Sequence, residues 1–196
     1  TLLIDSSPSS ATELCSTGSY SLTSPSVLTD GVHTASVTAT DLAGNLGVSS
    51  VDLSFTIDTS SPAQPPAPDL TAASDTGTSN TDNVTSITSP IVQGSCTNGD
   101  QIKLFIDSVD TGAIGSCNTG LYSITTPSVL SDNNYAYAVS VTDPAGNESI
   151  SSLSLAVTVD TTTPATPLVD NILTNDITPV ISGNATMGTG DILSVT

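Results

Sequence analysis

Basic and aromatic residues are almost absent from this chain of 196 residues. One Lys and no Arg stand against 19 acidic residues, the net charge is −18, and aromatic residues make up 3% of the sequence with no Trp. Nucleic-acid binding depends on clustered positive charge, which this composition excludes. No apolar run approaches the roughly 18 residues of a membrane-spanning helix, so we expect neither nucleic-acid binding nor membrane insertion in this segment.

Soft metal ligands and catalytic groups are equally scarce. His33 is the only histidine, and the three cysteines show no metal-binding spacing. This argues against transition-metal sites. His33 is expected to be an ordinary strand residue, because no Ser, His and Asp set recurs along the chain. The sequence therefore predicts no enzymatic activity.

The chain repeats itself with a period of 102 residues. DLAGN at 41–45 returns as DPAGN at 143–147, and Cys15 and Tyr20 pair with Cys117 and Tyr122. TPVISGNATMGTGDIL at 178–193 resembles SPIVQGSCTNGDQIKL at 89–104 and starts a third repeat. Self-similarity at a fixed period indicates tandem units. The predicted organisation is the C-terminal part of a first repeat (1–58), a linker (59–67), a complete repeat (68–160), a linker (161–167) and the N-terminal part of a third repeat (168–196).

The residues of each repeat favour an all-β fold. Short alternating runs such as YAYAVSVTD at 135–143 are typical of half-buried strands. A period near 100 residues is the size of one β-sandwich domain. We therefore predict seven-stranded antiparallel β-sandwiches joined end to end by short linkers rich in Pro and Thr. The strands expected in the complete repeat are 68–73, 90–96, 101–107, 113–117, 121–126, 135–142 and 152–159.

Two of the three cysteines are expected at the same end of this sandwich. With antiparallel succession, the strand that ends at Cys96 and the strand that ends at Cys117 both finish at one end, where a disulfide is geometrically possible. Two free buried thiols are the alternative. Cys15 is the copy of Cys117, so its partner is expected outside this segment. A disulfide implies an oxidising, extracytoplasmic location.

The acidic residues supply the main functional argument. Seventeen of the 19 are Asp, which favours turns, and there are almost no cations to pair with them. Strand succession places Asp75, Asp82 and Asp160, together with Asp132, at the end of the repeat just before the linker 161–167. Because clustered carboxylates repel one another, we expect a bound cation there. Hard oxygen ligands in irregular loops suit Ca²⁺.

The DPAGN loop lies at the opposite end of the repeat and allows two interpretations. Asp143 can accept the backbone N–H groups of its own loop, with Gly146 and Asn147 tolerating positive φ. This would be a purely structural turn, and it is the interpretation we favour for the loop. Alternatively, Asp143 and its copy Asp41 offer oxygens to an interdomain cation, and Asp143 does so together with Asp58 in the preceding linker.

These motifs together resemble a known family. DLAGN, FTIDTSSPAQP, SDTGTSNTDNVTSITSP, GLYSITTPSVLSD, DPAGN and VTVDTTTPATP are similar to the bacterial immunoglobulin-like (Ig-like) repeats of large calcium-binding surface adhesins of the RTX type. The resemblance implies Ig-like sandwiches in tandem, with Ca²⁺ near the linkers stiffening the rod. It carries the calcium role onto Asp75, Asp82 and Asp160, and onto Asp58 and Asp143. The cysteines depart from the family pattern, as does the shorter stretch VDNILTND at 169–176.

The predicted function is an extender of an adhesin or fibre at the bacterial cell surface or outside the cell. It would project a distal binding region for adhesion or biofilm formation, and its partners would be neighbouring repeats of the same polypeptide. One alternative is a self-assembling filament of like chains. Another is an Ig-like module that binds glycans or other ligands, which is weaker because aromatic platforms are nearly absent.

Overall fold

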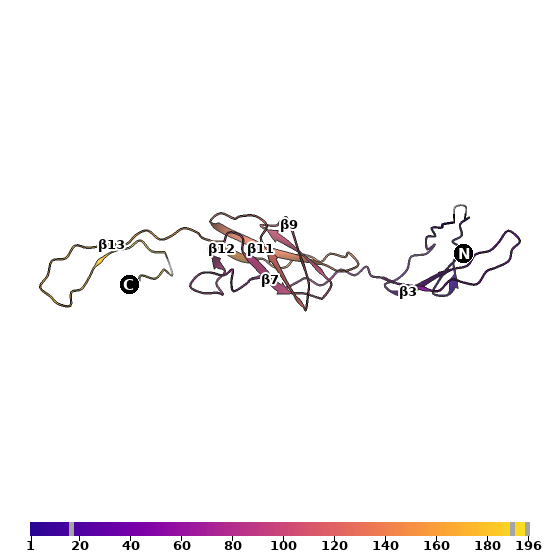
Figure 1. Ribbon diagram of the computed structural model, residues 1–196, viewed down its shortest axis with the longest axis horizontal. Helices are drawn as coiled ribbons and strands as arrows, with labels where there is room; N and C mark the ends of the chain where they lie inside the picture. Colours follow the sequence, from indigo (N-terminus) through magenta and orange to yellow (C-terminus); the bar gives the residue numbers. More distant parts are fainter. Residues whose placement is uncertain (16–17, 189–190, 195–196) are drawn as a thin grey trace.

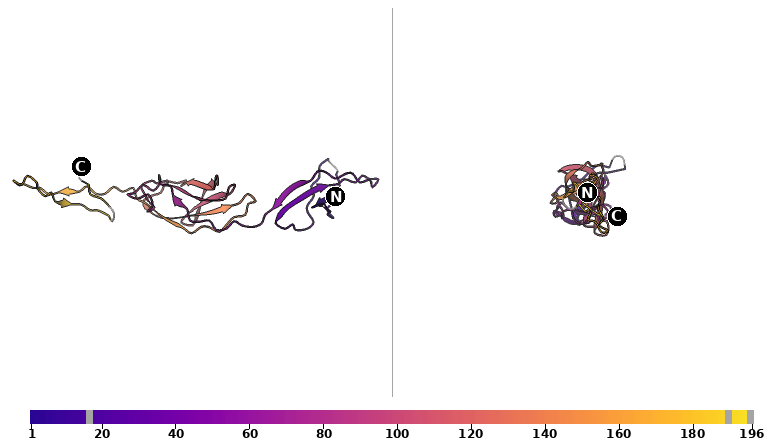
Figure 2. Two further views of the ribbon diagram at one scale, coloured as in Figure 1. Left: turned by 90° about the horizontal axis from the view of Figure 1, so that it is seen from below. Right: turned by 90° about the vertical axis from the view of Figure 1, so that its left-hand side faces the viewer.

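The computed structural model describes residues 1–15, 18–188 and 191–194. These residues form β-strands and loops, and none of them lies in a helix; accordingly, no helix in the described ranges could cross a membrane. Figures 1 and 2 show an elongated molecule in which an N-terminal part, a middle repeat and a C-terminal part follow one another along the long axis.

The two outer parts each form a small antiparallel sheet. The N-terminal sheet has the order β2–β1–β3–β4, from strands β1 (Leu2–Ile4), β2 (Ser7–Pro8), β3 (Gly31–Val37) and β4 (Leu53–Ile57). The C-terminal part holds one pair, β13 (Leu168–Val169) with β14 (Gly183–Asn184).

The middle repeat is a sandwich of two sheets. One has the order β10–β7–β5, from β5 (Asp69–Leu70), β7 (Ile91–Ser95) and β10 (Leu121–Thr125). The other has the order β6–β12–β11–β8–β9, from β6 (Val84–Thr85), β8 (Gln101–Ile106), β9 (Val109–Ser116), β11 (Asn133–Thr142) and β12 (Leu155–Val159). The predicted Ig-like β-sandwich class is confirmed.

Alternation along the strands builds the core between the sheets. In β8 every second residue, Ile102, Leu104 and Ile106, is buried, and in β10 the same holds for Tyr122 and Ile124. Side chains of a strand point alternately to its two faces, so these residues meet those of the facing sheet. The other buried members of the cluster are Leu70, Val92, Cys117, Tyr137, Val139, Val141 and Val157.

The β8–β9 hairpin and the short strand β6 differ from the sequence expectation. The strand expected at 113–117 is the end of the longer β9, which forms a hairpin with β8. Its turn residues Asp107 and Ser108 have φ of 51° and 66°, a conformation that aspartate tolerates but that a turn prediction based on Gly and Asn misses. The strand β6 was not predicted; it is only two residues long and pairs in parallel with β12. The repeat 68–160, which the structure describes throughout, therefore has eight strands rather than seven.

The last strand of the repeat begins later than expected, at Leu155 rather than residue 152. Just before it, the hydroxyl groups of Ser149 and Ser152 accept the backbone N–H groups of Val141 and Val139, both at 3.0 Å. Serine side chains thus replace main-chain carbonyls as acceptors for β11. Composition alone does not distinguish such a segment from a strand.

The predicted disulfide is confirmed. Cys96 and Cys117 are bonded, and their Cα atoms lie 5.8 Å apart. Cys96 follows β7 and Cys117 follows β9, so the bond links the two sheets at one end of the sandwich. Cys15 is exposed and free; pairing outside this segment stays a prediction.

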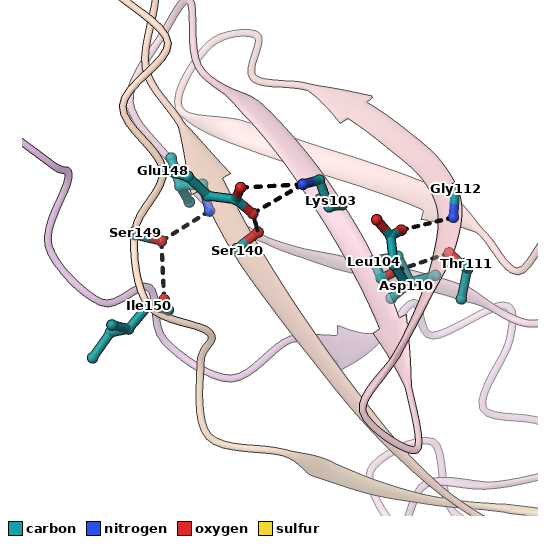
Figure 3. Close-up of polar contacts among 10 residues, drawn as sticks. Lys103, Leu104, Asp110, Thr111, Gly112, Ser140, Glu148, Ser149 and Ile150 are labelled. Carbon is teal, nitrogen blue, oxygen red and sulfur yellow. Dashed lines mark hydrogen bonds and ion pairs between the residues drawn. The ribbon is translucent and has the colours of Figure 1, made fainter.

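The only lysine forms an ion pair on the five-stranded sheet. Lys103 Nζ lies 3.0 and 3.2 Å from the two carboxylate oxygens of Glu148, which also accepts the hydroxyl of the buried Ser140 at 2.6 Å. Figure 3 shows the three side chains pointing toward one another from β8, β11 and the segment after β11. The hydrogen bond from Ser140, followed by the one from Lys103, lowers the pKa of Glu148 below its usual value.

We expect Lys103→Met to lower the free energy of unfolding by less than about 1 kcal/mol, because both partners are partly exposed. The contribution of a carboxyl group with a lowered pKa is present above its unfolded-state pKa and is lost as the pH falls through the folded-state pKa. The variant should therefore raise the pKa of Glu148 and differ least from the parent at low pH. Carboxyl ¹³C NMR is suited to this test because Glu13 is the only other glutamate. If the pKa of Glu148 is the same in the variant and in the parent, the hydrogen bond from Ser140 alone is responsible for lowering it.

Candidate functional site

The acidic loop 71–83 lies at the end of the middle repeat that carries the exit linker 161–167. The N–H of Thr158 in β12 donates to the carbonyl of Asn83 at 2.9 Å, and the N–H of Asp160 donates to the carbonyl of Thr85 at 2.9 Å. Thr78 lines a groove together with linker residues 164–167 and with Ala185 and Met187 of the C-terminal part. The loop thus reaches the junction between two repeats.

Asp75 is the most unusual acid of this loop because its side chain is buried. The residue is 4% exposed, and its Oδ2 accepts the N–H of Asn83 at 3.2 Å. Its Oδ1 and the side-chain oxygen Oδ1 of Asn83 are both buried and have no hydrogen-bond partner among the described residues. A buried carboxylate oxygen without a partner is costly, so a cation or a water molecule that binds these two acceptors would stabilise the folded loop.

Asp82 and Asp160 are exposed and help to shape the backbone. Asp82 Oδ1 accepts the N–H of Val84 at 3.2 Å, and Asp160 Oδ1 accepts the N–H of Thr162 at 2.9 Å. Across the part of the chain that the structure describes, no three Asp, Glu, His or Cys side chains group closely enough to hold a metal ion. Asp75, Asp82 and Asp160 therefore do not form the three-carboxylate cluster that the sequence suggested.

Asp132 is directed at the linker. Its Oδ1 accepts the N–H and the hydroxyl of Thr161 at 2.9 and 2.7 Å, and its Oδ2 accepts the hydroxyl of Thr162 at 2.7 Å. These bonds, with those to the Thr162 and Thr161 hydroxyls contributing most, lower the pKa of Asp132. The sequence analysis missed its copy Asp30, although the 102-residue period marks it. The Asp30 carboxylate accepts the corresponding hydrogen bonds from Thr59 and Ser60.

The DPAGN loop has the geometry of a structural turn. Asp143 Oδ1 accepts the N–H groups of Ala145 and Asn147, both at 2.9 Å, and its Oδ2 accepts the side-chain amide of Asn147 at 3.0 Å. The amide bond lowers the pKa of Asp143 most. Gly146 has φ of 96° as expected. Asn147 does not adopt positive φ; instead, its side-chain amide donates a hydrogen bond to Asp143.

The first repeat builds the same turn. Asp41 Oδ1 accepts the N–H groups of Ala43 and Asn45 at 2.9 and 2.8 Å, and Asp41 Oδ2 accepts the Asn45 amide at 2.8 Å. Asp58, the linker residue expected to share a cation with Asp143, turns its carboxylate to the N–H of Ser60 at 3.0 Å. All four carboxylate oxygens of Asp41 and Asp143 thus have hydrogen-bond donors, which supports the structural interpretation of this motif.

A comparison with known families agrees with this architecture. The profile of the bacterial Ig-like domain matches residues 1–59 and 62–161. The chain belongs to the bacterial Ig-like domain family. Bacterial Ig-like domains are non-enzymatic structural domains, and the surface or extracellular location that the family suggests is compatible with the disulfide. No curated protein shows a significant match to the chain.

Proposed function

We propose that these bacterial Ig-like repeats are a spacer of a secreted or surface-attached adhesin or fibre, stiffened by Ca²⁺ at the junctions between repeats. The spacer projects a distal binding region away from the cell for adhesion or biofilm formation. The single observation that carries the calcium part is the pair of buried, unpartnered oxygens on Asp75 and Asn83 beside the exit linker.

The donor set around this position suits calcium better than other ions. It consists of a carboxylate oxygen and an amide oxygen in an irregular loop, and Ca²⁺ accepts such oxygens together with backbone carbonyls and water. A cation would neutralise the buried charge of Asp75, in a region where the chain offers no lysine or arginine. Asp82 and Asp160 each keep a second carboxylate oxygen, Oδ2, on segments that adjoin Asn83 and β12.

The spacer acts by resisting bending between neighbouring repeats. Ca²⁺ held by Asp75 and Asn83 would fix the loop 71–83 against the end of β12, where the linker 161–167 begins. This limits bending at the junction and adds the free energy of calcium binding to the stability of the folded repeat.

Thermal unfolding of the whole chain in CaCl₂ and in EGTA tests the proposal. Calcium at about one hundred times its dissociation constant should add about 2.7 kcal/mol and raise the midpoint. Asp75→Asn should remove most of this shift while being tolerated in EGTA, because it removes a buried charge without changing the shape of the side chain. Asp110→Asn is the control, since Asp110 lies at the start of β9 and its Oδ1 accepts the N–H of Gly112 at 2.8 Å, a contact that involves neither the loop 71–83 nor the linker. An equal response of Asp75→Asn and the parent would refute the assignment.

A further inference from the structure

We propose that neighbouring repeats are also joined by a linker grip that needs no metal. The grip consists of three side chains at the linker 59–67. Asp30 of the first repeat binds Thr59 and Ser60, Asn147 of the second repeat binds Asp58 just before the linker, and Gln64 of the linker binds the second repeat. This inference rests on the spacer function but concerns a different set of contacts, which are complete without a cation.

The exit side of the grip is the contact between a linker and the repeat that precedes it. This contact occurs at both linkers with the same set of hydrogen bonds. Asp30 Oδ1 accepts the N–H and the hydroxyl of Thr59 at 3.1 and 2.8 Å, and its Oδ2 accepts the hydroxyl of Ser60 at 2.9 Å. Asp132 makes the corresponding three bonds to Thr161 and Thr162. One ionised carboxylate with three donors from two successive residues holds both the backbone and the side chains of the linker.

The entry side is formed by the asparagine of the DPAGN loop. The side-chain amide of Asn147 donates to Asp143 within its own loop and to the backbone carbonyl of Asp58, both at 3.0 Å. Gln64 adds a second bond, from its side-chain amide to the carbonyl of Ser151 at 2.7 Å. The second repeat is thereby bound to the linker at two points.

The two sides of the grip meet on consecutive residues. The second repeat holds Asp58, and the first repeat holds Thr59 and Ser60, so no free residue separates the two attachments. A linker held at adjacent positions by both neighbours has lost the backbone freedom that would let the repeats swivel. The DPAGN loop of the second repeat therefore has a role beyond its turn, because the side-chain amide of Asn147 also donates to the backbone carbonyl of Asp58.

Pulsed EPR distances on the whole chain in EGTA test the grip. In a Cys15→Ser background, spin labels at Ser54→Cys on β4 and Ala156→Cys on β12 report on the two repeats, since both positions are exposed. The parent should give a narrow distance distribution. Asn147→Ala and Asp30→Ala should each broaden it clearly. Asn45→Ala is the matched control, because Asn45 makes the same bond to Asp41 within its loop.

A broad distribution in the parent, or one that Asn147→Ala and Asn45→Ala change equally, would overturn the inference. Because the samples contain no calcium, the result is separate from the calcium proposal: either can fail while the other holds.

Amide hydrogen exchange gives a second readout on the complete repeat. Asp132→Ala should speed exchange of the Thr161 N–H by about tenfold, whereas Asp110→Ala should leave it unchanged. Unchanged exchange in Asp132→Ala would contradict the exit side of the grip.

Discussion

Replacing both Cys96 and Cys117 by alanine is expected to lower the free energy of unfolding of the middle repeat by about 3 kcal/mol. The bond joins residues separated by 21 positions and links the two sheets at one end of the sandwich. In the chain-entropy account, a bond that closes a loop of this length stabilises mainly by restricting the unfolded chain. Urea unfolding followed by circular dichroism measures the loss.

The double variant should still fold cooperatively. The N-terminal part of the third repeat carries Ala185 at the position of Cys96, so a cysteine at this position is not a general feature of the repeats. Cys15→Ser is the control and should leave stability unchanged, because Cys15 is exposed and free. A loss below about 1 kcal/mol in the double variant would mean that the unfolded chain is already compact without the bond.

Gly94→Ala is expected to destabilise the middle repeat by about 2–3 kcal/mol, because the new methyl group would overlap the ring of Tyr122. A Cβ at Gly94 would lie 2.5 Å from the hydroxyl oxygen of Tyr122 and 2.7 Å from two of its ring carbons. Tyr122 is 4% exposed and packed in the core between the sheets, and burial raises its pKa to about 12. Chemical denaturation of the purified variant gives the magnitude.

Two further variants separate this overlap from a general intolerance of glycine replacement. Gly77→Ala should cost little, because the nearest atom to its new Cβ is a backbone oxygen at 3.4 Å. Gly94→Ala combined with Tyr122→Leu should cost less than the sum of the two single changes, since the smaller side chain makes room for the methyl group. Strict additivity would show that the ring and the new methyl group do not compete for the same space.

The candidate site was only partly accessible from the sequence. Strand succession correctly placed Asp75 and Asp160 at the same end of the repeat, because antiparallel strands that differ by an even number of steps end together. Strand succession did not indicate which carboxylate oxygens accept hydrogen bonds from backbone N–H groups. Asp132 and Asp160 bind the linker, Asp82 binds its own turn, and only Asp75 is buried with an oxygen left free.

The sequence by itself determined the repeat and the all-β sandwich, and it predicted the Cys96–Cys117 bond with two free thiols as the alternative. The period and the alternation of apolar residues are patterns of the sequence itself, and antiparallel succession of the predicted strands places the two cysteines at one end. The tertiary structure decided the pairing of β6 with β12, the late start of β12 and the bond from Asn147 to Asp58. These features depend on donors and acceptors from residues far apart in the chain, up to 89 positions for Asn147 and Asp58, and such distances are set only when the sheets pack.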